Sequence, residues 1–531
     1  MRLTRRALPI FWSYHAWAGV TVGLLVYVMV LTGTITLFRH PLELWSEPLH
    51  QQTASTSSKK FQTALDLAIA RIGNTPEELW VVVPQGDHGA TTVSYELPDG
   101  RTWRQVLVDH ERATAVIERE ALATFLYHLH FLWHPAAPWL YYVAGFAAVA
   151  LLFAIVTGVL IHLRSLMQQL HRFRPHARLR VVWSDLHKVL GVVGLPFQTF
   201  YAYSGAFLVL GAPLATTLTS AFLGVDTERA RQWTGDEIEV AGEPPGTPST
   251  VLTLDDLVTV ARYEEPRLVV RSLSIRHHGR DNGSVEIDGS IEGGTTAISL
   301  RLRELDGAVT ANSTGRPENA SQQYGRWLTR LHFADLGGTG MRILYAVLGL
   351  ATSLTILSGN WIWMARRESR NTSILARLTA GFGAGIVVAI AALFLGSRLL
   401  PLDTFRRMTA EELTFALALT ACLAWSLAAR DVPALWWKMS ALAGAMLLLT
   451  PLFAARLSTA GLFGRPGARV GPVVGVDVTL LGSGMLLCIV AWALRRRTTS
   501  PVVTGPSKAS TRDPDVLETP FSAATRRGGD A

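Results

Sequence analysis

The chain has little charge and almost no cysteine for its length. Of its 531 residues, only 17% are charged and 49% are hydrophobic. An ordinary soluble domain has about 25% charged residues, and here the uncharged residues gather in long runs. This distribution excludes a single soluble globule, a disordered chain and a fibrous chain.

Several motifs of metal and redox proteins are also missing. The two cysteines, Cys422 and Cys488, lie in apolar runs, so no disulfide framework or thiolate zinc site can be built from them. No CxxCH occurs, which excludes covalently attached c-type haem. No GxGxxG stands between a strand pattern and a helix pattern, so no nicotinamide or flavin domain is indicated. The net charge of +8 does not favour nucleic-acid binding, because the arginines cluster beside apolar runs, where they set topology and contact anionic lipid.

Apolar stretches long enough to span a membrane dominate the chain. A bilayer core needs about 20 apolar residues in a helix. Eight stretches qualify, at 11–38, 139–163, 186–213, 341–364, 375–397, 411–429, 434–455 and 472–494. We therefore expect an all-α polytopic membrane bundle of about eight transmembrane helices. The expected divisions are 1–38 (N-terminus and first span), 39–138 (external), 139–213 (spans two and three), 214–340 (external), 341–366 (span four), 367–497 (four further spans) and 498–531 (disordered tail).

Arginine counts give an expected orientation. The 164–183 loop holds five arginines and no acid, and arginine clusters also follow spans four and eight. These segments lie on the same side as the N-terminus, so we expect both termini to be cytoplasmic. The first apolar run is too long for a signal peptide, which favours a retained anchor.

The segments 39–138 and 214–340 are predicted to form two small α+β domains on the external side of the membrane. Residues 61–72 and 253–262 have helical spacing. Alternating apolar residues follow each of them in strand-like runs, for example at 103–109 and 283–289. Neither segment contains a catalytic triad or a metal-ligand spacing.

An internal repeat relates spans one and two to spans three and four. His15 is followed by Gly19 and Gly33, and His187 by Gly191 and Gly205, at offsets of four and eighteen residues in both cases. His130 precedes span two as His332 precedes span four. Spans two and four end in Thr157-Gly158 and Ser358-Gly359. Two copies in the same orientation predict a pseudo-two-fold axis along the membrane normal.

The repeat predicts two levels of paired histidines. His15 and His187 would meet near the cytoplasmic side and His130 and His332 near the external side, because eighteen helical residues span about 27 Å. Paired imidazoles in a helical bundle are suited to axial ligation of haem iron, so two b-type haems are expected. His162, which is replaced by a tryptophan in the second copy, could substitute for one of the cytoplasmic pair.

Some roles remain open at this stage. His128 and His134 compete with His130 as ligands. Asp185 could orient His187 or cap a helix. The repeated glycines most simply permit close helix packing, and in a haem protein they could also make room for the porphyrin.

The chain resembles the PepSY-associated transmembrane family. The residues that carry this resemblance are Thr157-Gly-Val-Leu-Ile-His162, Phe173-Arg-Pro175, Asp185-Leu-His187-Lys-Val-Leu-Gly191, Leu195-Pro-Phe197, Leu331-His332-Phe333 and Ser358-Gly359, within about 10–366. The resemblance implies a bacterial inner-membrane protein with PepSY-like periplasmic domains, and some members look like ferric-siderophore reductases with two haems. This sequence departs from the family at Gln198, where many relatives have histidine, and in the four further spans, which contain no histidine.

We therefore expect a haem-dependent reductase that passes electrons to a periplasmic ferric-siderophore or similar iron chelate. Its electron donor would be a quinol, a reduced flavin or a partner protein, and membrane lipid would surround it. One alternative is a non-enzymatic protein whose external domains bind peptides or regulate a protease. Another is an iron or siderophore transporter, which would require polar residues in the middle of spans one to four, where there are almost none.

Overall fold

The computed structural model describes most of the chain. The described residues are 7–46, 61–83, 91–96, 103–110, 114–117, 122–134, 136–171, 173–177, 179–224, 245–292, 297–312, 320–365, 374–400, 407–457, 461–463 and 471–499. The tail after residue 499, which the sequence predicts to be disordered, lies outside them.

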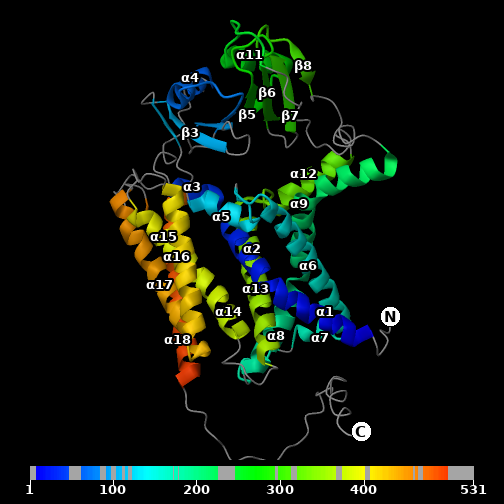
Figure 1. Cartoon of the computed structure of the whole chain (residues 1–531), viewed down its shortest axis with the longest axis vertical. Helices are drawn as coiled ribbons and strands as arrows, with labels where there is room; N and C mark the ends of the chain where they lie inside the picture. The colour runs from blue at the N-terminus through cyan, green and yellow to red at the C-terminus, as the bar shows by residue number, and fades with distance from the viewer. Residues whose placement is uncertain are drawn as a thin grey trace, which may run out of the picture.

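The repeated part of the chain forms one side of a helical bundle, and the last helices of the chain form the other (Figure 1). Its long helices are α1 (Ala7–Thr21), α2 (Gly23–Thr36), α6 (Trp139–His162), α8 (Leu179–Val193), α9 (Leu195–Leu223) and α13 (Gly338–Ala365). The short helices α3 (Arg39–Ser46), α5 (Leu122–His130), α7 (Leu166–Gln169) and α12 (Ala320–His332) lie near the ends of the long ones. Spans two and four are the single helices α6 and α13, whereas spans one and three are each broken into two helices.

The two breaks fall at the same place in the repeat. α1 and α2 form an angle of 60°, and α8 and α9 form an angle of 70°. The breaks lie at Val22 and Gly194, each seven residues after the repeated histidine. In span three Pro196 favours the break, because proline fits the first turn of a new helix and has no N–H to donate to the previous one.

Because of the bends, the two helices of each broken span pack against different halves of the repeat. α1 packs on α6 and α8 packs on α13, each within its own half. Among the long helices, α2 then packs mainly on α13 and α9 mainly on α6, so both contact the opposite half. The two halves are therefore interlocked around the axis that the sequence repeat predicts.

The two long segments between spans fold into one shared sheet. The first contributes α4 (Phe61–Ile72), β1 (Glu78–Val82), β2 (Thr91–Glu96), β3 (Trp103–Asp109) and β4 (Thr114–Ile117), and the second α11 (Leu254–Glu264), β5 (Leu268–Arg276), β6 (Ser284–Ile291), β7 (Ala297–Arg303) and β8 (Val309–Asn312). The strand order is β4-β3-β2-β1-β5-β6-β7-β8, with antiparallel neighbours throughout. The helices and strands lie where the sequence predicts them. The expected pair of separate small domains is corrected, because β1 and β5 pair across the repeat.

A single hydrophobic core stabilises this sheet. Buried side chains from both halves, including Leu79 in β1 and Leu273 in β5, pack under α4 and α11. α11 begins with a capping box in which Thr253 and Asp256 exchange side-chain to backbone hydrogen bonds. In Figure 1, α4 and α11 lie on the side of the sheet away from the helical bundle.

The last helices of the bundle pack on α2, α3 and α5 of the first half and on α13 of the second. They are α14 (Ile374–Gly383), α15 (Gly385–Leu399), α16 (Arg407–Ala428), α17 (Val432–Leu457) and α18 (Gly471–Thr499). Their core includes Tyr27, Leu44 and Trp45 of the first half. Trp45 is fully buried and donates from Nε1 to Asp477 at 2.8 Å, and the guanidinium carbon of Arg398 lies 3.5 Å from its ring centre. This contact joins α3 to α15 and α18.

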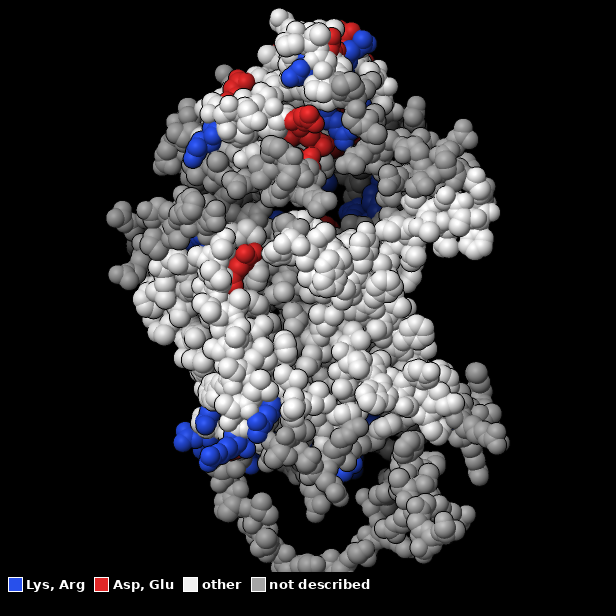
Figure 2. All heavy atoms as spheres, viewed as in Figure 1, with Lys and Arg blue, Asp and Glu red and all other residues white. Residues whose placement is uncertain are grey.

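The surface agrees with a polytopic membrane protein. Six of the described helices are long and apolar enough to span a membrane, or eight if each bent pair counts as one span. Figure 2 shows a largely uncharged band across the visible face of the bundle, with charged residues on the sheet and a basic cluster at the opposite end. We call these two ends the sheet side and the far side.

Candidate functional site

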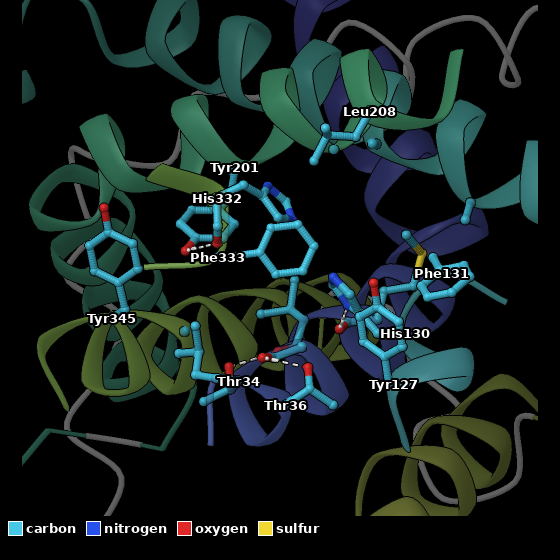
Figure 3. A pocket seen from close by; sticks show the side chains of 18 of the residues that line it. Thr34, Thr36, Tyr127, His130, Phe131, Tyr201, Leu208, His332, Phe333 and Tyr345 are labelled. Atoms are coloured by element: carbon cyan, nitrogen blue, oxygen red, sulfur yellow. Dashed lines mark hydrogen bonds between the residues drawn. The ribbon is translucent and has the colours of Figure 1, made fainter. Parts of the chain in front are cut away.

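Two histidines face each other on the sheet side of the bundle. His130 ends α5 and His332 ends α12, at equivalent positions in the two halves. Their ring centroids lie 6.2 Å apart, with 34° between the ring planes. Figure 3 shows the two side chains approaching from different helices, with Tyr127, Tyr201 and Phe333 close by.

Both short helices end in the same strained turn. Leu132 and Ala334, each two residues after the histidine, have φ angles of 57° and 53°. This left-handed region is unfavourable for residues other than glycine and is enriched at functional sites. The turn ends each helix directly after its histidine, and it was not visible in the sequence because no glycine marks it.

A second pair of histidines lies on the far side. His15 in α1 and His187 in α8 have ring centroids 6.1 Å apart, with 74° between the planes. The structure thus brings together both of the pairs that the repeat predicts. Each half supplies one histidine to each level.

All four imidazoles are hydrogen-bonded through Nδ1 to another helix of their own half. Nδ1 contacts the Ala154 carbonyl in His15 (2.8 Å), the Thr355 carbonyl in His187 (2.8 Å), the Met29 carbonyl in His130 (2.7 Å) and the Ser204 hydroxyl in His332 (2.8 Å). A carbonyl can only accept, so Nδ1 carries the proton in the first three rings and Nε2 has a free lone pair. No described residue makes a hydrogen bond to Nε2 of any of the four, which leaves this atom available to a metal ion.

Each imidazole rests against a hydroxyl residue followed by glycine. The pairs are Thr157-Gly158 for His15, Ser358-Gly359 for His187, Thr32-Gly33 for His130 and Ser204-Gly205 for His332. In all four, the hydroxyl also contacts the carbonyl three residues earlier in its helix. The sequence revealed these dipeptides as landmarks of the repeat but not their role. The signal that could have revealed it is that there is one pair for each histidine.

The glycine of each pair gives the ring its space. A Cβ at Gly33 would lie 2.5 Å from the His130 ring, and one at Gly158 would lie 3.1 Å from the His15 ring. The corresponding distance is 3.1 Å at Gly359 and 3.9 Å at Gly205. The hydroxyl and glycine together therefore fix where each imidazole lies.

Each histidine pair lines a cavity of its own. The sheet-side cavity has a volume of about 740 Å³ and the far-side cavity about 330 Å³. Both volumes lie in the range of small-molecule and cofactor sites, about 300–1,000 Å³. Val26, Leu151, Gln198 and Thr352 line both cavities, one from each of the four spans. We call these four residues the partition between the cavities. Val26 and Gln198 are equivalent in the repeat, as are Leu151 and Thr352, so the residues from the first half are apolar and those from the second half are polar.

Two glycines beside the far-side histidines are not needed for close packing of the helices. Gly19 and Gly191 line the far-side cavity, four residues after His15 and His187. No described atom lies within 4 Å of a Cβ built at Gly19, and the nearest to one at Gly191 is a Thr355 methyl carbon at 4.0 Å. Close packing, the simplest role expected for these glycines, therefore does not explain them, and they leave room for a ligand beside the rings.

Polar groups at the sheet-side cavity suit an acidic ligand. Arg342 and Asp335 line it from the second half, and Arg39 and Glu43 from the first. Arg342 contacts Asp335 through Nη2 at 3.3 Å, and its buried Nε has no hydrogen-bond partner among the described residues. A carboxylate in the cavity would satisfy this donor.

The other candidate histidines lie in different places: His162 is close to the far-side pair, whereas His128 and His134 lie outside the sheet-side cavity. His162 lines the far-side cavity, but it has no ring contact with His15 or His187 in the described chain. His128 packs on Trp133 at 4.7 Å, and neither it nor His134 is among the described residues that line the sheet-side cavity.

Asp185 does not orient His187 directly. It is buried and accepts hydrogen bonds from Arg174 Nε at 2.9 Å and Nη2 at 3.1 Å. This ion pair fixes the connection before α8, so the orientation of His187 depends on Thr355 and Ser358 instead.

Comparison with known proteins gives the family. The model of the PepSY-associated TM region matches residues 12–366, which include both histidine pairs and all eight strands. The chain belongs to this family. It is also 32% identical over 377 residues to the uncharacterized protein PA4219 of Pseudomonas aeruginosa, covering 66% of this chain and 90% of that relative. The helices α14 to α18 lie outside the family match.

Proposed function

We propose that this membrane protein binds two b-type haems, one in each cavity, and passes electrons across the membrane to a ferric-siderophore or similar iron chelate. The observation that carries the proposal is the pair of facing imidazoles at each of two levels. In each pair the rings come from different halves of the repeat, and their Nδ1 atoms are occupied by the protein.

The separation of the rings supports ligation of one metal ion by each pair. An imidazole nitrogen lies about 2 Å from a metal that it binds and about 1 Å from its own ring centre, so two rings on opposite sides of one ion have centroids about 6 Å apart. The distances here are 6.1 Å and 6.2 Å. Within the described residues, no group of three or more His, Cys, Asp and Glu side chains could hold a metal ion. Each pair therefore suits a metal whose other ligands come from a prosthetic group such as a porphyrin.

The cavities fit such a group. Gly19 and Gly191 leave space beside the far-side rings, and Arg342 offers a buried donor to a propionate on the sheet side. Bound haem would supply one-electron transfer. The chain's own residues orient the imidazoles through Nδ1, surround them with apolar side chains, and separate the two levels with the partition.

The direction of transfer follows from topology. The C-terminal end of α18, which carries Arg495, Arg496 and Arg497, lies at the far side (Figure 1), and the positive-inside rule favours a cytoplasmic position for that end. The sheet would then be periplasmic, above the cavity that holds His130 and His332. Electrons would enter on the far side from a quinol, a reduced flavin or a partner protein, and leave beneath the sheet.

A visible absorption spectrum of the purified full-length protein tests the proposal. We expect two b-type haems per chain, and we expect the reduced protein to be reoxidised by ferric chelates. His130→Ala should remove the sheet-side component and lower the content to one haem. His128→Ala is the matched control, because this histidine lies on the same helix but outside the cavity, and it should leave both haems bound.

A colourless protein with native helix content by circular dichroism would contradict the proposal. That result would favour a non-enzymatic role for the sheet.

A further inference from the structure

One of the four histidines differs from the others in the group that its Nδ1 contacts. The imidazoles of His15, His187 and His130 share a backbone carbonyl with the neighbouring hydroxyl residue. When Nε2 of His332 binds a metal ion, Nδ1 carries the proton, and its acceptor is then the hydroxyl oxygen of Ser204, at 2.8 Å. Ser204 is fully buried, and its hydroxyl also contacts the Tyr201 carbonyl, at 3.4 Å.

This difference changes how strongly the ring donates electrons to a metal. The acceptor on Nδ1 tunes the basicity of a metal-bound imidazole, and a good acceptor makes the ring a better donor. An amide carbonyl is a better acceptor than a hydroxyl whose own proton is only weakly engaged. A poorer donor stabilises the oxidised metal less, which raises the reduction potential of the site.

We propose that Ser204 is a positioning residue whose hydroxyl, a weaker acceptor than the backbone carbonyls at the other three histidines, makes His332 the weakest electron donor of the four imidazoles and leaves the sheet-side site with a higher reduction potential than the far-side site. This inference rests on the proposed function. It deepens that function because a higher potential beneath the sheet favours electron flow toward the sheet side.

The effect of Ser204 is separable from the folding of the site. The Tyr201 hydroxyl donates to the backbone carbonyl of His332 at 2.9 Å, so the end of α12 is held without Ser204. Gly205, which leaves room for the His332 ring, is unchanged when only the hydroxyl is removed. Ser204→Ala should therefore keep haem at this level.

The experiment is a spectroelectrochemical titration of both haems in full-length protein. In the unaltered protein we expect the sheet-side midpoint potential to be the higher of the two. In Ser204→Ala we expect it to rise further while the far-side potential stays fixed, because Nδ1 of His332 then has no acceptor at all. Ser204→Thr, which retains the hydroxyl, should restore the original value. The low-spin ferric EPR signal of the sheet-side haem should change in the alanine variant only.

Thr157→Ala is the matched control on the far side. Its hydroxyl lies 3.3 Å from His15 Nδ1, but the Ala154 carbonyl remains as the closer acceptor at 2.8 Å. We expect neither potential to move in this variant.

Two different failures can be told apart. If the unaltered protein binds no haem, the proposed function fails. If it binds two haems and the sheet-side potential is unchanged or lower in Ser204→Ala, only the role of Ser204 is overturned.

Discussion

At the level of single residues, glycine has two distinct uses around the histidines. Gly33 and Gly158 are required by the imidazoles themselves, because a Cβ at either position would come too close to a ring. Gly19 and Gly191 face open space in the far-side cavity instead. A side chain at these two positions would compete with a ligand and not with the protein.

Gly19→Leu should therefore lower far-side haem content without destabilising the fold. Leucine favours a helix over glycine by up to about 1 kcal/mol, and the described chain has no atom within 4 Å of the new Cβ. We expect the haem-free protein to unfold at the same or a higher temperature, while the spectrum loses its far-side component.

Gly145→Leu provides the contrast. A Cβ there would lie 2.7 Å from Leu210 and Val209 of α9, so this change should destabilise the helix pair by about 1–3 kcal/mol. If Gly19→Leu behaves like Gly145→Leu, or binds haem normally, the open space beside His15 has been misinterpreted.

The pairing of the four histidines could be predicted from the sequence, but the groups that contact each Nδ1 could not. The offsets from His15 and His187 to later glycines are equal, and a repeat brings equivalent residues together across its axis. Which helix faces Nδ1 depends on the bends at Val22 and Gly194, and only Gly194 is accompanied by a proline. Predicting the Nδ1 contacts therefore requires the directions of the helices, which residue spacing alone does not give.

At the level of helices and strands, the two halves differ most where span one ends. The first half turns into α3 after Thr36, whereas α9 continues as one 29-residue helix. α3 is held by Trp45, whose contacts with Asp477 and Arg398 reach helices outside the repeat. The additional helices thus fix the connection between span one and the sheet.

Trp45→Phe should measurably weaken this connection. It removes the donor to Asp477, whose side chain is 1% exposed, and an unpaired buried acceptor costs about 1–3 kcal/mol. Tyr27→Phe is the control, because it removes one neutral hydrogen bond to the Gly383 carbonyl and should cost only about 1 kcal/mol. Thermal unfolding in detergent compares the two, and an equal or smaller effect at Trp45 would contradict a role in fixing α3.

At the level of the whole molecule, the halves are joined twice. In the bundle, each bent span crosses to the opposite half, and above it β1 and β5 pair along their lengths. The strands themselves were predictable from alternating apolar residues. Their shared sheet was not, because β1 would be acceptable as the edge of a smaller sheet, and local sequence does not distinguish a paired edge from an exposed one.

A cysteine pair across this junction tests both the architecture and the orientation. Val82 and Ser272 are partners in β1 and β5, next to the hydrogen bond from the Val83 N–H to the Arg271 carbonyl. Because antiparallel pairs alternate, Val82 and Ser272 form a non-hydrogen-bonded pair with Cα atoms about 4.5 Å apart, which a disulfide can bridge.

We expect Val82→Cys with Ser272→Cys to form a disulfide in intact cells, as detected by non-reducing peptide mapping, because the periplasm is oxidising. In the control, Val82→Cys with Arg276→Cys, the second site is four residues along the strand, about 13 Å away, and no bond should form. The native Cys422 and Cys488 lie in α16 and α18, away from the sheet. If the bond forms only when the purified protein is treated with an oxidant, the shared sheet is supported but the sheet lies on the cytoplasmic side. If no bond forms under either condition, the pairing of β1 with β5 is contradicted.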